Sequence, residues 1–106
     1  MMPVPGLYLF GSYLSSDNPH DIDLLWLYDK AVMSPAEMLK VVKDKEACMT
    51  SKFPVPIHHT IMSSSENSET GFIDQVGAVY IGSASDDTER ILGRMRRQVD
   101  KAREHE

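Results

Sequence analysis

Two short apolar segments near the start of the chain constrain its fold most strongly. Residues 7–10 form a run of large apolar side chains without helical spacing, bounded by Gly6 and Gly11. Residues 21–28 form a second run, apolar throughout except for Asp21 and Asp23 at its beginning. Short apolar runs bounded by turn residues are typical of buried strands. We therefore expect two strands joined by the polar, turn-forming residues 12–20.

The rest of the chain predicts helices that alternate with further strands. Ser34 and Glu37 have the spacing of a capping box, with Pro35 at the first helical position, which predicts a helix over residues 35–48. The other expected elements are a third strand over residues 55–62 that begins at a sheet edge, a polar loop over residues 63–70, a fourth strand over residues 78–81 and a final helix over residues 86–106. The loop is expected to lead into a short helix that includes Phe72, Ile73 and Val76, although Gly71 sits inside it. This order predicts one α/β (α+β) domain over residues 1–106, a small mixed sheet with helices packed mainly on one face.

Composition narrows the class of protein. Apolar residues make up 42% of the chain and charged residues 25%, as in an average globular protein. The net charge of -5 argues against bulk nucleic-acid binding, which needs a basic surface. The sequence has neither an apolar run of about 20 residues nor a signal peptide, so we expect a cytoplasmic protein without a membrane partner. Cys48 is the only cysteine, which we expect to be a buried, reduced thiol.

The residues that point to chemistry lie around the loop between the first two strands. Gly11 and Ser12 follow the first strand, and a glycine there lets backbone N–H groups approach a phosphate closely. Asp21 and Asp23 are two residues apart on a strand, so both side chains project from one face. Magnesium is commonly held by one or two carboxylates together with substrate phosphates. This order of residues predicts a site for a cation and a phosphate.

With its Gly11-Ser12 followed by Asp21-Ile22-Asp23, the chain resembles the polymerase-beta-type nucleotidyltransferase superfamily, especially its minimal members. The resemblance is local and is best over residues 7–27. It implies a metal-dependent transfer of a nucleoside monophosphate from a nucleoside triphosphate to an acceptor hydroxyl. Gly11 and Ser12 would then bind the nucleotide, while Asp21 and Asp23 would hold Mg²⁺, or Mn²⁺.

The chain departs from that pattern in two ways. Eight residues, none of them basic, separate Ser12 from Asp21, where minimal members usually have about ten. The family's third carboxylate comes from the next strand, but residues 55–62 contain no acid and have His58 or His59 in its place. An imidazole can bind Mn²⁺ or act as a general base. We favour His58, because Thr60 then matches the small residue that in the family often follows the acid two positions later. The alternative is a catalytically degenerate binding or regulatory protein, such as the antitoxin half of a toxin–antitoxin pair.

Other polar residues have simpler interpretations. A basic stripe on the final helix could steer phosphates, although a charged face balanced by nearby acids is more common: Arg90, Arg94, Arg97 and Lys101. Glu66 and Glu69 are better explained as helix-start acids or solvated side chains than as a displaced third carboxylate. Trp26 and Tyr28 alternate out of phase with the aspartates, which predicts that both lie in the core. A transition-metal site combining both histidines with the aspartates is a weaker alternative.

Overall fold

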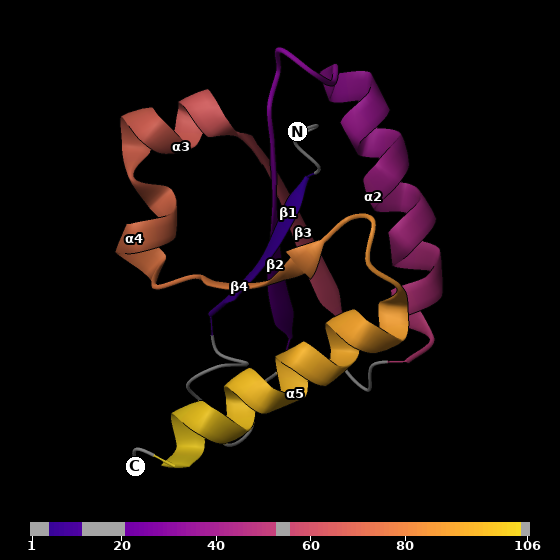
Figure 1. The fold of residues 1–106 in the computed structure, drawn as a ribbon, viewed down its shortest axis with the longest axis vertical. Coiled ribbons are helices and arrows are strands. Elements are labelled where there is room, and N and C mark those ends of the chain that lie inside the picture. Colours follow the sequence, from indigo (N-terminus) through magenta and orange to yellow (C-terminus); the bar gives the residue numbers. More distant parts are fainter. Residues whose placement is uncertain (1–4, 12–20, 53–55, 105–106) are drawn as a thin grey trace.

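The computed structural model describes residues 5–11, 21–52 and 56–104, which form a mixed four-stranded sheet with helices (Figure 1). The strands are β1 (Gly6–Phe10), β2 (Ile22–Tyr28), β3 (Ile57–Ser63) and β4 (Val79–Ser83). The helices are α2 (Pro35–Thr50), α3 (Ser64–Thr70), α4 (Phe72–Val76) and α5 (Thr88–Glu104). The small α+β fold expected from the sequence is therefore confirmed.

The sheet has the strand order β3-β2-β1-β4. β1 pairs antiparallel with β2 and with β4, whereas β2 pairs parallel with β3. The parallel pair is joined by α2, as parallel neighbours need a crossover connection. The third strand lies at the sheet edge, as expected. This topology brings the end of β1, the start of β2 and the start of β3 together, because Phe10 is opposite Asp23 and Asp23 is opposite His58.

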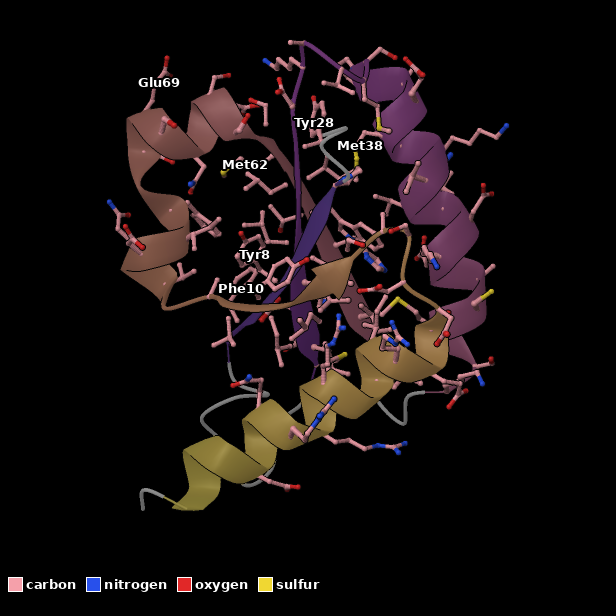
Figure 2. The ribbon with its side chains drawn as sticks, in the orientation of Figure 1. Tyr8, Phe10, Tyr28, Met38, Met62 and Glu69 are labelled. Carbon is pink, nitrogen blue, oxygen red and sulfur yellow. The ribbon has the colours of Figure 1, made fainter. Side chains whose placement is uncertain are left out.

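One face of the sheet carries the hydrophobic core. Its inward residues are fully buried against α2 and α5, and they include Trp26, as the sequence predicted: Leu7, Leu9, Ile22, Leu24, Trp26 and Ile81. The helices α2 and α5 contribute apolar side chains from their inward sides: Met38, Val42, Met49, Ile91, Leu92 and Met95. Figure 2 shows Tyr28 and Met38 directed toward each other between β2 and α2. The two long helices thus cover this face.

The opposite face is only partly covered, by the short helices α3 and α4. Neither of these helices has a buried residue. Tyr8, Phe10 and Met62 lie in the space between this face and the two helices (Figure 2), and each keeps part of its surface exposed. An edge-to-face contact between Phe10 and Phe72, with ring centroids 5.5 Å apart, fixes α4 on the sheet. Most of the helix packing is therefore on the other face.

Residues 63–70 are not the polar loop that the sequence suggested. Ser63 begins α3 with a capping box, in which its side chain accepts a hydrogen bond from the Glu66 backbone N–H and the Glu66 carboxylate accepts one from the Ser63 N–H. Gly71 then ends α3 in a left-handed conformation, with φ 65°, and α4 begins directly after it. The segment forms a helix because its capping residues hydrogen-bond to backbone groups that are otherwise unpaired at the ends of a helix.

Two further expectations change in detail. Cys48 is exposed rather than buried, because it lies next to Met49 on α2 and only the Met49 side of the helix turns toward the core.

The last helix begins at Thr88 rather than at residue 86, and the Asp87 carboxylate accepts a hydrogen bond from the Arg90 N–H in its first turn. Of the apolar face expected for this helix, Ile91, Leu92 and Met95 are buried, and the side chains of residues 99 and 102 lie outside the described part.

Candidate functional site

The end of β1 and the start of β2 meet at Gly11 and Asp23. Gly11 directly follows Phe10, the residue opposite Asp23 in the antiparallel pair, and has a φ of 83°. A Cβ at this position would lie 3.2 Å from the Asp23 Cγ and closer still to its Oδ2. The positive φ favours glycine here, and any side chain would also displace the Asp23 carboxylate. The Gly11 backbone and the Asp23 carboxylate form one compact polar corner at the end of the sheet.

Asp21 and Asp23 place two negative charges at this corner. Partial burial of the Asp23 carboxyl and the nearby charge of Asp21 both raise its pKa, and the positive charge of a protonated His58 lowers it. The raised pKa means that the ionised form of Asp23 is destabilised here, and a bound cation would reduce this destabilisation. The donor set, two carboxylates next to an exposed backbone turn, fits the oxygen ligands that Mg²⁺ and Mn²⁺ accept.

His58, rather than His59, lies beside the aspartates. β3 runs parallel to β2 with His58 opposite Asp23, so both side chains project from the partly covered face. The His58 Nε2 lies 3.3 Å from the Asp21 Oδ2, and 62% of the His58 side chain is exposed. The corner thus contains an imidazole paired with one carboxylate and next to a second one. Sequence reasoning placed these three residues in one site, but the pairing of Asp21 with His58 follows only from the register of the sheet.

His59 belongs to the core side of the sheet. Its Nδ1 accepts a hydrogen bond of 2.9 Å from the indole Nε1 of Trp26, and the two rings lie 6.0 Å apart. Burial lowers the pKa of this imidazole, an effect opposed by the negative charge of Glu46. His59 is therefore a structural residue that fixes Trp26, and it does not reach the aspartates.

The other candidates take up structural roles or lie outside the described residues. Ser12, the second half of the glycine-serine pair, belongs to the segment that the structure leaves undescribed. Arg94 binds Asp86 at 2.7 Å and is half-buried, so it is part of a fixed ion pair and not of an exposed basic stripe. Glu66 caps α3, as a helix-start acid does. Within residues 5–11, 21–52 and 56–104 no group of three or more His, Cys, Asp and Glu side chains is arranged to hold a metal ion.

A pocket that the sequence did not predict opens at the other end of the partly covered face. Tyr8 and Tyr80 lie next to each other there, with ring centroids 5.5 Å apart and planes inclined by 70°. The pocket depends on the antiparallel pairing of β1 with β4, two strands about seventy residues apart, and local sequence patterns carry no signal for such a pairing.

Comparison with known proteins gives no assignment. No family model matches the chain, and no curated protein and no solved structure is significantly similar to it. Among the helices of the described residues, none combines the length and the hydropathy that crossing a membrane requires.

Proposed function

We propose that this protein is a nucleotidyltransferase-like domain that binds a nucleoside triphosphate with Mg²⁺ or Mn²⁺ and transfers the nucleoside monophosphate to an acceptor hydroxyl. One observation carries the proposal: the Gly11 backbone meets the Asp23 carboxylate so closely that a side chain there would displace it, with Asp21 alongside. The Gly11 backbone beside two carboxylates suits a triphosphate that arrives with its cation.

Each residue of the corner would contribute to binding in a different way. Asp23 and Asp21 would ligate the cation, which supplies positive charge to the phosphates when it is bound. The Gly11 backbone N–H would donate a hydrogen bond to a phosphate oxygen, since Gly11 lies against the Asp23 carboxylate that would hold the cation. Binding at this corner would hold the α-phosphate in place for in-line attack, and such positioning accounts for most of the catalysis in phosphoryl transfer.

His58 occupies the place of a third carboxylate in the proposed reaction. In that reaction a bond forms between the acceptor oxygen and the α-phosphorus, the bond from this phosphorus to the bridging oxygen breaks, and pyrophosphate leaves. The acceptor hydroxyl must lose a proton, and a neutral imidazole can take it near neutral pH. The Asp21 carboxylate, 3.3 Å from Nε2, would orient the ring and stabilise the imidazolium that results.

The test is a titration of the whole chain with each of the four common ribonucleoside triphosphates, first in Mg²⁺ and then in Mn²⁺. We expect nucleotide binding that requires the cation, together with pyrophosphate release when alcohol-bearing acceptors are supplied. Asp23→Asn should abolish both, because it removes a charged ligand without changing the size of the side chain. Asp44→Asn is the matched control, since Asp44 lies exposed on α2, and it should change neither.

The outcomes distinguish an enzyme from the alternative, a binding or regulatory protein without catalytic activity. The specific observation that favours the alternative is that the His58 imidazole is already paired with Asp21. The resemblance to the family would require a third carboxylate from this strand. Nucleotide binding that depends on Asp23 but gives no pyrophosphate with any acceptor or metal would favour a binding or regulatory protein, such as an antitoxin. A wild-type protein that binds neither cation nor triphosphate would overturn the proposal.

A further inference from the structure

The aromatic pocket lies on the same face of the sheet as Asp23 and His58. Its volume is about 320 Å³, and its lining comes from β1, β4, the end of β2 and the start of α3: Gly6, Tyr8, Tyr80, Leu27, Asp29 and Ser64. Gly6 is opposite Leu27 in the β1–β2 pair, and Phe10 is opposite Asp23. The pocket is thus four residues along β2 from Asp23, or about 13 Å in an extended strand.

Two tyrosines give the pocket flat, apolar walls. Tyr8 and Tyr80 are neighbours in the β1–β4 pair and meet edge to face. Tyr80 lies on the edge strand β4 and keeps 53% of its surface exposed. An aromatic ring with an accessible face can stack on a planar ligand, and stacking on nucleobases tolerates every base because each has a π-face.

Gly6 keeps the floor of the pocket open. A Cβ at this position would lie 3.4 Å from Cε1 of Tyr8 and 3.5 Å from Cε1 of Tyr80. These are ordinary contact distances, so an alanine would fit the fold and fill space between the two rings. The absence of a side chain at Gly6 leaves that space to a ligand.

The rim of the pocket adds polar groups to these apolar walls. Asp29 follows β2, and its Oδ1 accepts a hydrogen bond of 2.9 Å from the Ala31 N–H. Its second oxygen can accept a hydrogen bond from a ligand amine, and the Ser64 hydroxyl can donate or accept one. Flat apolar walls with a few polar groups at the rim suit a heteroaromatic ring with exocyclic amino groups.

We propose that this pocket binds the base of a nucleoside, stacked against Tyr80. Ligand pockets usually range from about 300 to 1,000 Å³. The volume therefore suits a base with part of its ribose, and is too small for a complete nucleoside triphosphate. The choice of a nucleobase among planar rings rests on the proposed function, which requires a nucleotide on this face, whereas the pocket itself does not depend on that function.

The base can come from either of two sources. It can belong to the donor nucleotide, whose phosphates would then extend toward Asp23, or to a nucleoside-bearing acceptor. Both have the same chemistry in the pocket, and they differ in whether binding at the pocket is linked to binding at the carboxylates.

The experiment measures calorimetrically the binding of adenosine, guanosine, cytidine and uridine to the full chain without metal, with ribose 5-phosphate as a probe that lacks a base. We expect at least one nucleoside to bind and ribose 5-phosphate not to bind. Tyr80→Ala should weaken nucleoside binding about fivefold or more, because it removes the stacking ring. Gly6→Ala should also weaken it, because the added methyl group fills the floor of the pocket. Gly93→Ala is the control, since a Cβ there meets nothing within 4 Å.

A second titration, with ATP and Mn²⁺, identifies the source of the base. If Gly6→Ala weakens both nucleoside and ATP binding, the pocket holds the base of the donor; if it weakens nucleoside binding alone, the pocket holds an acceptor. The inference is overturned if no nucleoside binds, or if Gly6→Ala and Tyr80→Ala leave nucleoside binding unchanged. Pyrophosphate with Mn²⁺ tests the carboxylate site separately, because its binding should depend on Asp23 and not on Gly6.

Discussion

The two faces of the sheet differ sharply, and the adjacent residues His58 and His59 show how. His59 faces α2 and α5, where the apolar residues of the sheet are almost completely buried, and it is fixed by the indole of Trp26. His58 points to the other face, where 62% of its side chain is exposed beside Asp21. One step along a strand therefore changes an imidazole from a structural residue into one that can meet a ligand.

The difference separates stability from function within a small protein. The core face holds the two long helices and most of the apolar burial, so it supplies most of the hydrophobic stabilisation. The other face carries the paired charges, the close approach at Gly11 and the aromatic pocket, all of which leave polar groups or rings exposed. Substitutions on the core face should therefore change stability most, and those on the other face should change binding most.

Trp26→Ala should have the largest effect on stability. It removes a fully buried ring and also the donor that binds His59, and losses of this kind cost about 3–5 kcal/mol. Thr60→Ala is the counterpart on the other face, because Thr60 pairs with Leu25 in the neighbouring strand and is partly exposed. It should cost less than about 1 kcal/mol. Urea denaturation followed by circular dichroism measures both, and equal losses would contradict the division between the faces.

Gly11→Ala should cost about 2–3 kcal/mol, because a left-handed backbone conformation is strained for alanine and because its Cβ collides with the Asp23 carboxylate. Gly77→Ala isolates the first effect, since Gly77 has a φ of 64° and open space around its Cβ. We expect it to cost about 1 kcal/mol. In an Asp23→Ala background the cost of Gly11→Ala should fall toward the Gly77 value, and an unchanged cost would show that the two residues do not touch.

Most of the fold could be predicted because its signals are local. The capping box at Ser34 and Glu37 begins α2 where expected, and the two apolar runs form β1 and β2. α3 was missed although Ser63 and Glu66 form the same kind of capping box, because its polar, serine-rich sequence reads as a loop. Cys48 was expected in the core because cysteine is usually buried, but its position on α2 leaves it exposed.

The site could be predicted only in part, for a physical reason. Asp21 and Asp23 share a face because of strand alternation, a property visible in the sequence. The choice of His58 over His59 depends on which residue of β3 lies opposite Asp23, and that register is set by packing across the sheet. The Tyr8–Tyr80 pocket depends on an even more distant pairing, so no motif could indicate it.

Stability should depend on pH through His59. Burial lowers the pKa of His59 below its ordinary value of 6.5, so the unfolded chain binds a proton there more readily than the folded protein does. Stability should therefore fall as the pH decreases below about 6.5. The physical reason is local, because a protonated Nδ1 cannot accept the hydrogen bond from Trp26.

Melting temperatures measured from pH 8 to pH 5 for the wild type, His59→Gln and Thr60→Ala test this assignment. His59→Gln should flatten the decline at low pH, although it lowers stability at pH 8 through the loss of packing. Thr60→Ala, at the next position of β3, removes no titratable group and should leave the shape of the profile unchanged. A profile that His59→Gln leaves unchanged would contradict the structural role assigned to His59.

The smallest effect concerns the charges at the proposed site. Burial and the charge of Asp21 hold the pKa of Asp23 above its ordinary value of 3.8, so Asp21→Asn should lower that pKa. Because the folded protein binds the Asp23 proton more tightly than the unfolded chain, ionising Asp23 opposes folding, and stability decreases as the pH rises through this range. Asp21→Asn should weaken that decrease. Carboxyl ¹³C shifts recorded by NMR against pH give the pKa directly.

Asp29→Asn is the matched control for this titration. Asp29 follows the far end of β2, six residues from Asp23 and thus about 20 Å away along an extended strand. At 0.15 M ionic strength the screening length is about 8 Å, so its charge should not affect the Asp23 carboxyl. Equal shifts of the Asp23 pKa in the two variants would mean that net charge, and not the neighbouring carboxylate, sets the titration. A shift confined to Asp21→Asn would locate the unfavourable charge at the corner where a cation is proposed to bind, and Mn²⁺ should then lower the Asp23 pKa of the wild type as well.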